Sequence, residues 1–228
     1  MKEKILTMSF DDCEDYDRRL CDLLRKYGIK STFFIISNQL SWVWEDYKRY
    51  GETTTIRRVS AEEIPTTYKG MEIASHTCDH RCSVKDLDET VVKSANDLKK
   101  LCGYDVCGLA YPGGEYTHEL SQALKEKGIK YARTIRCTKN FSLPENWLEW
   151  HPTCHYADAD AMRLADEFLN YNGDETLLFN MYGHSYELTE NLPDRNWEYF
   201  ENLLKKLAGR SDVKYMTNIE VYEHFNKN

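Results

Sequence analysis

Ile5-Leu-Thr-Met-Ser-Phe-Asp-Asp12 is an apolar run that ends in two adjacent carboxylates. The apolar part predicts a buried strand over residues 5–10. Charged groups are costly to bury without partners, so Asp11 and Asp12 indicate a site at the strand end rather than part of a core. Neighbouring residues on a strand point to opposite faces. Both carboxylates can therefore serve one site only if the chain leaves strand geometry there.

Strands of this buried type alternate with helical patterns along the rest of the chain. This alternation implies parallel strands covered by helices, and seven or eight such units favour a closed barrel over an open sheet. In such barrels the site lies at the carboxyl ends of the strands. Residues 38–58 are polar and aromatic, and we expect a long loop there. We expect strands at 5–10, 31–36, 71–75, 106–111, 129–135, 148–152, 176–182 and 213–217, and helices at 15–27, 60–65, 86–101, 117–127, 159–171, 194–208 and from Asn218, which should cap the last helix.

The chain has 228 residues, of which 41% are hydrophobic and 30% are charged. This is an ordinary globular composition, and we expect a single domain over residues 1–228. The net charge of −8 argues against binding to nucleic acid or to an anionic membrane, since both need clustered Lys and Arg. No apolar run approaches the ~20 residues of a membrane helix. Met1-Lys-Glu-Lys leads into the first strand without a signal peptide, which favours a cytoplasmic location.

The eight cysteines are expected to be reduced thiols, because the chain is larger than a small secreted domain and carries no signal peptide. The spacing of Cys78-x3-Cys82 and Cys102-x4-Cys107 does not match a zinc ribbon. A structural or redox role for the thiols remains an alternative. The aromatic segment 41–50 could form either a dimer contact or a substrate lid. The first alternative would make the protein a homo-oligomer.

His76-x3-His80 supplies two imidazoles that can point in one direction on a helix or in a compact loop. Two imidazoles and one carboxylate bind a first-row divalent ion and leave positions open for water and substrate. Asp12 is the candidate third ligand. Such an ion lowers the pKa of bound water from about 16 to about 7 and polarises a carbonyl. The neighbouring Asp11 could then accept the proton of the water.

Two later features have both a functional and a structural interpretation. His184 could protonate a leaving amine, because the pKa of histidine lies near working pH, or it could simply close a strand as a half-buried residue. The turn Pro112-Gly-Gly could aim backbone N–H groups at a developing oxyanion, or it could be an ordinary turn.

Ser9-Phe-Asp-Asp12, Ser75-His-Thr-Cys-Asp-His80, Ala110-Tyr-Pro-Gly113 and the late strand into His184 resemble, in order, the motifs of the polysaccharide deacetylase family (NodB-homology, chitin-deacetylase-like). This resemblance implies an α/β fold, a distorted (β/α)7 barrel, and metal-dependent hydrolysis of an N- or O-acetyl group, usually on a sugar. Zinc is the usual ion, with Co2+, Ni2+, Mn2+ or Fe2+ as other options. By position, the resemblance implies a base at Asp11, metal ligands at Asp12, His76 and His80, an oxyanion donor at the N–H of Gly113 and an acid at His184.

The chain departs from the third motif of the family at two positions. The family often has an arginine that holds the base where this chain has Ala110, and Arg133 or Arg136 on the next expected strand is the candidate replacement. The residue after the proline is often aromatic but is glycine here. The missing wall of the sugar site is then expected from Tyr111, Tyr116 or Trp150.

The fourth motif of the family is not recognisable in Trp147-Leu-Glu-Trp-His-Pro-Thr-Cys-His155. His151 and His155 repeat the spacing of the first histidine pair. We interpret His155 as an additional site residue and His151 as structural.

Taken together, these patterns predict a metal-dependent hydrolase that removes an acetyl or similar acyl group from an N-acetylated sugar, a glycoconjugate or a related amide. The missing signal peptide favours a small intracellular substrate over a cell-wall polymer. A non-sugar C–N bond is an alternative target. Ala110 also leaves open a carbohydrate-binding protein that keeps the barrel but has lost catalysis.

Overall fold

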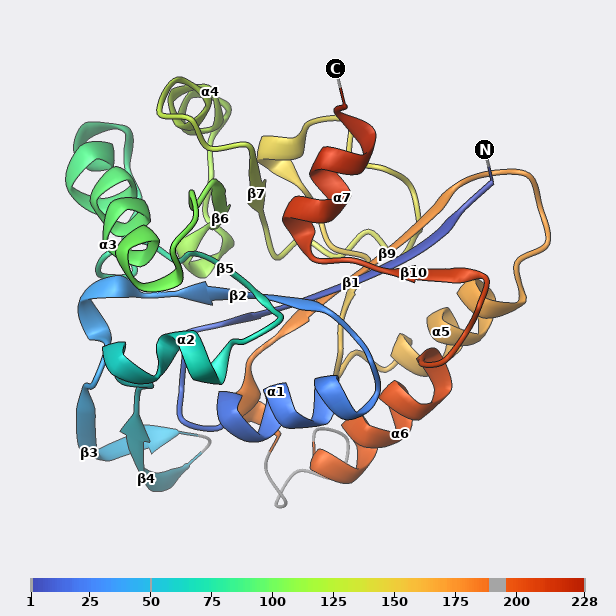
Figure 1. The fold of residues 1–228 in the computed structure, drawn as a ribbon, viewed down its shortest axis with the longest axis horizontal. Coiled ribbons are helices and arrows are strands. Elements are labelled where there is room, and N and C mark those ends of the chain that lie inside the picture. The colour runs from blue at the N-terminus through green and yellow to red at the C-terminus, as the bar shows by residue number, and fades with distance from the viewer. Residues whose placement is uncertain (1, 50, 189–195, 228) are drawn as a thin grey trace.

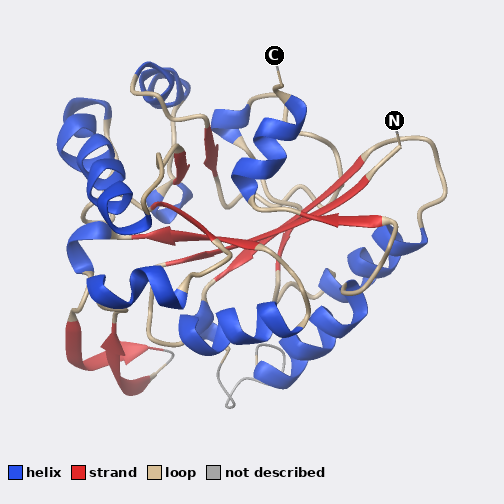
Figure 2. Ribbon diagram, viewed as in Figure 1, coloured by secondary structure: helices blue, strands red, loops and turns tan. Residues whose placement is uncertain are grey.

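A curled sheet of eight parallel strands is the central element of the computed structural model, which describes residues 2–49, 51–188 and 196–227 (Figures 1 and 2). The strands follow the order β7-β6-β5-β2-β1-β9-β8, and β10 also pairs with β1. They are β1 (Lys4–Asp11), β2 (Ser31–Ile35), β5 (Glu72–Ser75), β6 (Gly108–Ala110), β7 (Tyr131–Arg133), β8 (Cys154–His155), β9 (Leu177–Gly183) and β10 (Val213–Tyr215). The helices around the sheet are α1 (Asp17–Lys26), α2 (Ile64–Thr67), α3 (Lys93–Cys102), α4 (His118–Glu126), α5 (Ala161–Asn170), α6 (Trp197–Leu207) and α7 (Asn218–Phe225).

Residues 150–155 close the sheet into a distorted (β/α)7 barrel, because they bond to β7 on one side and to β9 on the other. The Trp150 N–H donates to the Ala132 carbonyl at 3.0 Å, and the Thr153 N–H donates to the Asn180 carbonyl at 2.7 Å. β1 pairs with β9 along one edge, and its other edge is divided between two strands. Residues 4–6 pair there with β10, and residues 8–11 pair with β2. The expected barrel is confirmed, with parallel strands whose carboxyl ends meet at one rim.

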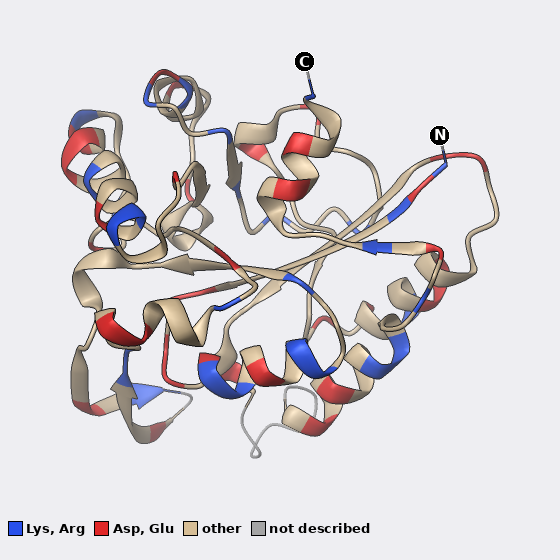
Figure 3. Ribbon diagram, in the orientation of Figure 1, with Lys and Arg blue, Asp and Glu red and all other residues tan. Residues whose placement is uncertain are grey.

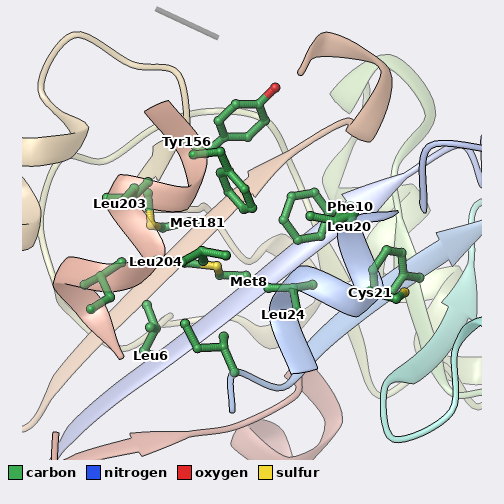
Figure 4. Close-up of a cluster of buried hydrophobic side chains, with 14 of the residues drawn as sticks. Leu6, Met8, Phe10, Leu20, Cys21, Leu24, Tyr156, Met181, Leu203 and Leu204 are labelled. Carbon is green, nitrogen blue, oxygen red and sulfur yellow. The ribbon is translucent and has the colours of Figure 1, made fainter. Parts of the chain in front are cut away.

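The outer face of the sheet packs against α1, α5 and α6 through the largest apolar cluster (Figure 4). Leu6, Met8 and Phe10 of β1 lie on this face, and Phe10 meets Phe200 of α6 edge to face with 5.9 Å between ring centroids. Successive residues of a strand alternate between faces, so the other side chains of β1 point into the barrel. They are Ile5, Thr7, Ser9 and Asp11.

Residues 38–58 are not the long loop that the sequence predicts. Within them, β3 (Val43–Arg49) and β4 (Glu52–Arg57) form an antiparallel pair apart from the barrel sheet (Figure 1). The pairing register shifts between Trp44 and Tyr47, where Asp46 adopts a φ of 54°. Most side chains of β3 are exposed. The shift and the exposure remove the apolar alternation that normally marks a strand.

Three other expectations about local structure need correction. Residues 148–152 do not form a strand, because Trp147–Glu149 is a 3-10 turn and only a single bridge joins Trp150 to Arg133. The short strand in this region is β8. The last helix is capped by Thr217 rather than Asn218, since the Thr217 hydroxyl accepts the Glu220 N–H. The expected helix at 194–208 is described from residue 196, and α6 begins at Trp197; residues 194 and 195 lie outside the described residues.

A buried polar network fills the barrel interior near the start of β5. The Glu72 carboxylate accepts hydrogen bonds from the Tyr131 hydroxyl at 2.6 Å, the Thr32 hydroxyl at 2.7 Å and the Ile219 N–H at 2.9 Å. Burial raises the pKa of Glu72 to about 7, although these donors favour the ionised form. The network ties the first turn of α7 to the inside of the barrel.

Basic and acidic residues are interspersed over the surrounding helices (Figure 3). No helix among the described residues is long and apolar enough to cross a membrane. All eight cysteines are free, as expected for reduced thiols.

Candidate active site

The two carboxylates at the end of β1 serve one site because the chain leaves strand geometry between them. Asp12 has a φ of 82° and Cys13 a φ of 51°, both in the left-handed region that costs free energy for residues other than glycine. The Asp12 N–H is held by the Phe34 carbonyl of β2 at 3.1 Å. Asp11 and Asp12 then face two different histidines at the carboxyl rim of the barrel.

His76 and His80 meet Asp12 at this rim. His76 directly follows β5, and the chain then turns through Thr77 and His80, both with positive φ. One ligand atom from each of Asp12, His76 and His80 lies within 4.8 Å of the other two. His76 Nε2 is 3.8 Å from Asp12 Oδ1. The structure thus brings together the three residues that sequence spacing suggested as ligands.

These three residues fit a divalent ion. His76 Nδ1 lies 2.9 Å from the carbonyl oxygen of Ala110, an acceptor that fixes the proton on Nδ1 and leaves Nε2 free to bind a metal. Burial lowers the pKa of His76 despite the nearby Asp11 and Asp12 charges, and this favours the neutral imidazole that a metal needs. Ligand atoms ~2.1 Å from a shared ion lie ~3.0–3.4 Å apart, so only a small contraction of the set is required.

Arg133 holds Asp11 from the neighbouring part of the barrel. Its Nη2 group donates to both carboxylate oxygens of Asp11, and the Arg133 side chain is fully buried. Burial alone would raise the pKa of Asp11. The Arg133 charge, with those of His76 and His184, outweighs it and holds that pKa below its usual value. Arg133 pairs directly with Ala110 across β6 and β7. The arginine that the third motif lacks is therefore supplied one strand away.

Glu187 links two further histidines to this centre. His155 Nε2 lies 2.8 Å from Glu187 Oε2, and His184 Nδ1 lies 3.5 Å from the same oxygen. The other nitrogen of His184, Nε2, is 4.0 Å from Asp11 Oδ2. Burial would lower the pKa of His184, but the carboxylates of Glu187, Asp11 and Asp12 outweigh it and raise the pKa. The arrangement favours a protonated His184 aimed at the centre.

Residues 1–132 match the family model described as Polysaccharide deacetylase, which is more than half of the chain. The chain belongs to the polysaccharide deacetylase family.

Solved structures share the fold of this family member. A candidate polysaccharide deacetylase from Mycobacterium smegmatis is 15% identical, with 98% of this chain and 90% of that chain covered and a TM-score of 0.64. A peptidoglycan deacetylase, PdaC from Bacillus subtilis, is 18% identical (99% and 92% covered, TM-score 0.56). A family 4 acetyl xylan esterase from Clostridium thermocellum, solved with a cobalt ion, is 16% identical (97% and 91%, TM-score 0.55). A comparison with curated proteins gave no match.

The remaining predicted site residues of this deacetylase-family chain lie at different depths. Gly113 is exposed on the rim, with a φ of 63°, in the turn that follows Ala110. The Tyr111 ring instead packs in an apolar cluster outside the barrel, and its hydroxyl donates to the Leu148 carbonyl at 2.8 Å. Trp150 is 1% exposed and packs inside the barrel against Tyr131. The aromatic rings of Tyr111 and Trp150 are therefore not at the ligand set.

Among the other candidates, His155 is connected to the site indirectly: it pairs with Glu187, whose carboxylate also lies near His184. His151 lies away from the ligand set and contacts the Thr134 hydroxyl at 2.6 Å through its Nδ1. Arg136 is exposed, so Arg133 is the arginine of the pair that meets Asp11. Sequence reasoning missed Glu187. Its signal was a glutamate three residues after His184, the spacing of a helical first turn in which the Glu187 side chain reaches back to the His184 N–H.

A cavity of about 450 Å3 opens beside Asp12 and His80. Its far wall comes from the β3–β4 pair and from the turn after β9, in particular from Trp44, Tyr47 and Tyr186. From the sequence, the aromatic wall was expected from Tyr111, Tyr116 or Trp150, and the segment 41–50 was left open between a dimer contact and a substrate lid. The structure instead has aromatic residues of the segment expected to be a loop next to the ligand set.

Proposed function

We propose that this family member is a metal-dependent hydrolase of an acetylated sugar or related amide, built as one catalytic domain over residues 1–228. The observation that carries the proposal is the position of Asp11, which is bonded to buried Arg133 and lies 4.0 Å from His184, next to the set Asp12, His76 and His80. A carboxylate held by an arginine and a histidine, both close to a ligand set, are the base and acid that acyl hydrolysis needs.

A divalent ion held by Asp12, His76 and His80 would activate water for attack at neutral pH and polarise the acyl carbonyl. Zinc suits this donor set, and Co2+, Ni2+, Mn2+ or Fe2+ are alternatives.

The acid and base roles fall to residues outside the ligand set. Asp11 accepts the proton of the attacking water, and Arg133 keeps Asp11 ionised and in position. His184 donates a proton to the leaving amine or alcohol, and Glu187 orients it. The exposed N–H of Gly113 is the proposed donor to the acyl oxygen as negative charge develops there.

The test separates metal binding from turnover. We expect Asp12→Ala and His80→Ala to lose bound metal, measured by elemental analysis, together with acetate release from N-acetylated sugars. Asp11→Asn should retain the metal but lower kcat by about 100-fold or more, the range for a general base. The matched control is Asp174→Asn, which changes an exposed carboxylate away from the site.

Full metal content and full activity in Asp12→Ala or His80→Ala would overturn the ligand assignment. If the metal-loaded protein binds acetylated sugars with saturation but releases no acetate, the carbohydrate-binding alternative is favoured. Release of acetate or another acyl group only from non-sugar amides would keep the chemistry and change the substrate.

A further inference from the structure

The β3–β4 hairpin is bonded to the chain segment that directly follows Asp12. The Asp15 N–H donates to the Arg57 carbonyl at 2.8 Å, and Glu14 forms an isolated antiparallel bridge with Arg58. The hairpin therefore lies against this segment through the edge of β4 that does not face β3. This contact places side chains of the hairpin next to the candidate ligand.

Glu14 is a buried carboxylate that has no role in the proposed reaction. It is 1% exposed, and its two oxygens accept hydrogen bonds from the guanidinium group of Arg49 at 3.0 and 2.7 Å. Arg58 Nη1 lies 3.7 Å from the same carboxylate. A buried carboxylate is stable only with partners of this kind. Glu14 thus joins the end of β3 to the residue that directly follows β4.

Arg58 connects this group of charges to Asp12. Arg58 Nη1 donates to the Asp12 carbonyl oxygen, and the same atom lies 3.9 Å from Asp12 Oδ2. The Asp12 N–H is held by the Phe34 carbonyl, so both backbone polar groups of Asp12 are bonded. A residue other than glycine keeps a φ of 82° only when its surroundings fix it. Arg58 is one of the groups that fix this conformation.

Arg49 holds Glu14 from the other side of the hairpin. Its guanidinium carbon lies 3.7 Å from the centroid of the Tyr186 ring, so the guanidinium group is fixed by an aromatic face as well as by a carboxylate. Glu14 remains paired with Arg49 if Arg58 is replaced. Replacing Arg58 therefore leaves no buried carboxylate without a partner.

We infer that Arg58 is a positioning residue for the metal ligand Asp12, and that Glu14 acts through Arg58 by fixing its guanidinium group. The inference rests on the proposed function, because that function makes Asp12 a ligand. Arg58 holds the backbone of Asp12 in the left-handed conformation that turns the carboxylate toward His76 and His80. Groups that orient a ligand in this way typically change metal affinity by about 10–100-fold.

The test measures metal affinity rather than turnover. Metal-free protein is titrated with zinc in competition with a chromophoric chelator, and the dissociation constant is compared with that of the unsubstituted protein. We expect Arg58→Met to bind zinc about 10-fold more weakly. Charge alone predicts the opposite sign, because removing a nearby cation favours binding of a divalent ion. The direction of the change therefore separates positioning from electrostatics.

Two variants serve as comparisons. Arg57→Met removes the same charge from the neighbouring arginine, which is exposed on the other face of β4, and it should leave zinc affinity unchanged. Arg58→Lys keeps a donor and a charge without the planar fork, and it should bind zinc more tightly than Arg58→Met. Glu14→Gln should weaken zinc binding in the unsubstituted protein but not in Arg58→Met, because its effect passes through Arg58.

Unchanged or tighter zinc binding in folded Arg58→Met overturns the inference. If Arg58→Met does not fold, as judged by far-UV circular dichroism, unchanged affinity in both Arg58→Lys and Glu14→Gln overturns it. Zinc binding that depends on Asp12 and Arg58 in a protein that releases no acetate leaves the inference standing, and the proposed reaction fails. Zinc binding that does not depend on Asp12, or no zinc binding, contradicts the proposed function and the inference together.

Discussion

Arg133 is the residue that contacts Asp11, the proposed base, and lowers its pKa. A family arginine at position 110 would reach the base from β6, and here the small side chain of Ala110 is paired with Arg133 on β7. Both positions lie at the carboxyl end of adjacent parallel strands, so either can reach the same carboxylate. The alanine in the third motif is therefore compatible with catalysis.

Replacing Arg133 tests whether it takes the role of the family arginine that is missing at position 110. Arg133→Met removes the cation that lowers the pKa of Asp11, so we expect that pKa to rise and the acid limb of the kcat/KM profile to move to higher pH by about 1–3 units. The base is active only when ionised, which sets this direction. Leaving a buried carboxylate unpaired should also cost about 3–5 kcal/mol of folding free energy, measured by chemical denaturation.

Arg133→Lys keeps the charge and is the matched control, with a smaller shift of the same limb. An unchanged acid limb in folded Arg133→Met would show that Arg133 does not set the ionisation of Asp11.

The sequence predicted which side chains the structure brings together at the rim better than it predicted the contacts between them. Asp11, Asp12, His76, His80 and His184 are readable because each stands at a strand end or in a marked motif. Spacing could not choose between Arg133 and Arg136, because that choice depends on where β7 ends: Arg133 is its last residue, and Arg136 lies beyond it and is exposed. Glu187 was missed, because its only local signal is the three-residue spacing from His184, and its contact with His155 depends on the fold.

At the scale of elements, the strands with continuous apolar runs were predictable and the irregular ones were not. β1, β2 and β9 are buried along their length and were found. The β3–β4 pair was not, because its exposed side chains and the shift near Asp46 give no period. Tertiary contacts, rather than local pattern, also place β8, which has only two residues.

The junction between β5 and α7 yields a prediction about stability. Glu72 has a pKa of about 7 in the folded protein against an ordinary value of 4.5, so its contribution to stability is full below pH 4.5 and is lost as the pH rises through 7. Between pH 5 and 7.5 the loss should be about 2 kcal/mol. Glu72→Gln should remove this loss, because a neutral amide does not titrate and the Tyr131 hydroxyl can accept in place of donating.

The measurement is the free energy of unfolding by urea at pH 5 and pH 7.5 for both proteins. Other titrating groups are common to both and cancel in the difference between them. Equal pH dependence in the two proteins would mean that folding does not raise the pKa of Glu72.

At the scale of the whole molecule, the thiols provide a test of the redox alternative. All eight cysteines are free, and burial raises the pKa of the Cys13 and Cys21 thiols, which makes them unreactive in the fold. Titration of protein unfolded without reductant should therefore count eight thiols. Reductant should leave Tm unchanged. A shortfall in the count, or a Tm that falls on reduction, would indicate a disulfide.

The barrel itself was predictable from alternation of buried strands and helices, together with the family motifs. The residues that close the barrel were not predictable, because residues 150–155 join β7 to β9 mainly through backbone hydrogen bonds that no side-chain pattern marks. The divided edge of β1 was not predictable either. There β10 pairs with residues 4–6 and β2 pairs with residues 8–11.

That divided edge has a consequence for how the protein folds as it is synthesised. β1 leaves the ribosome first, yet two of its three partners, β9 and β10, come from the last quarter of the chain. Contacts that join distant parts of a sequence form slowly, because the entropy of closing a long loop is lost before the contact is gained. The strand that carries both carboxylates therefore stays half paired until β9 and β10 have been synthesised, and the candidate site is among the last parts of this barrel to assemble.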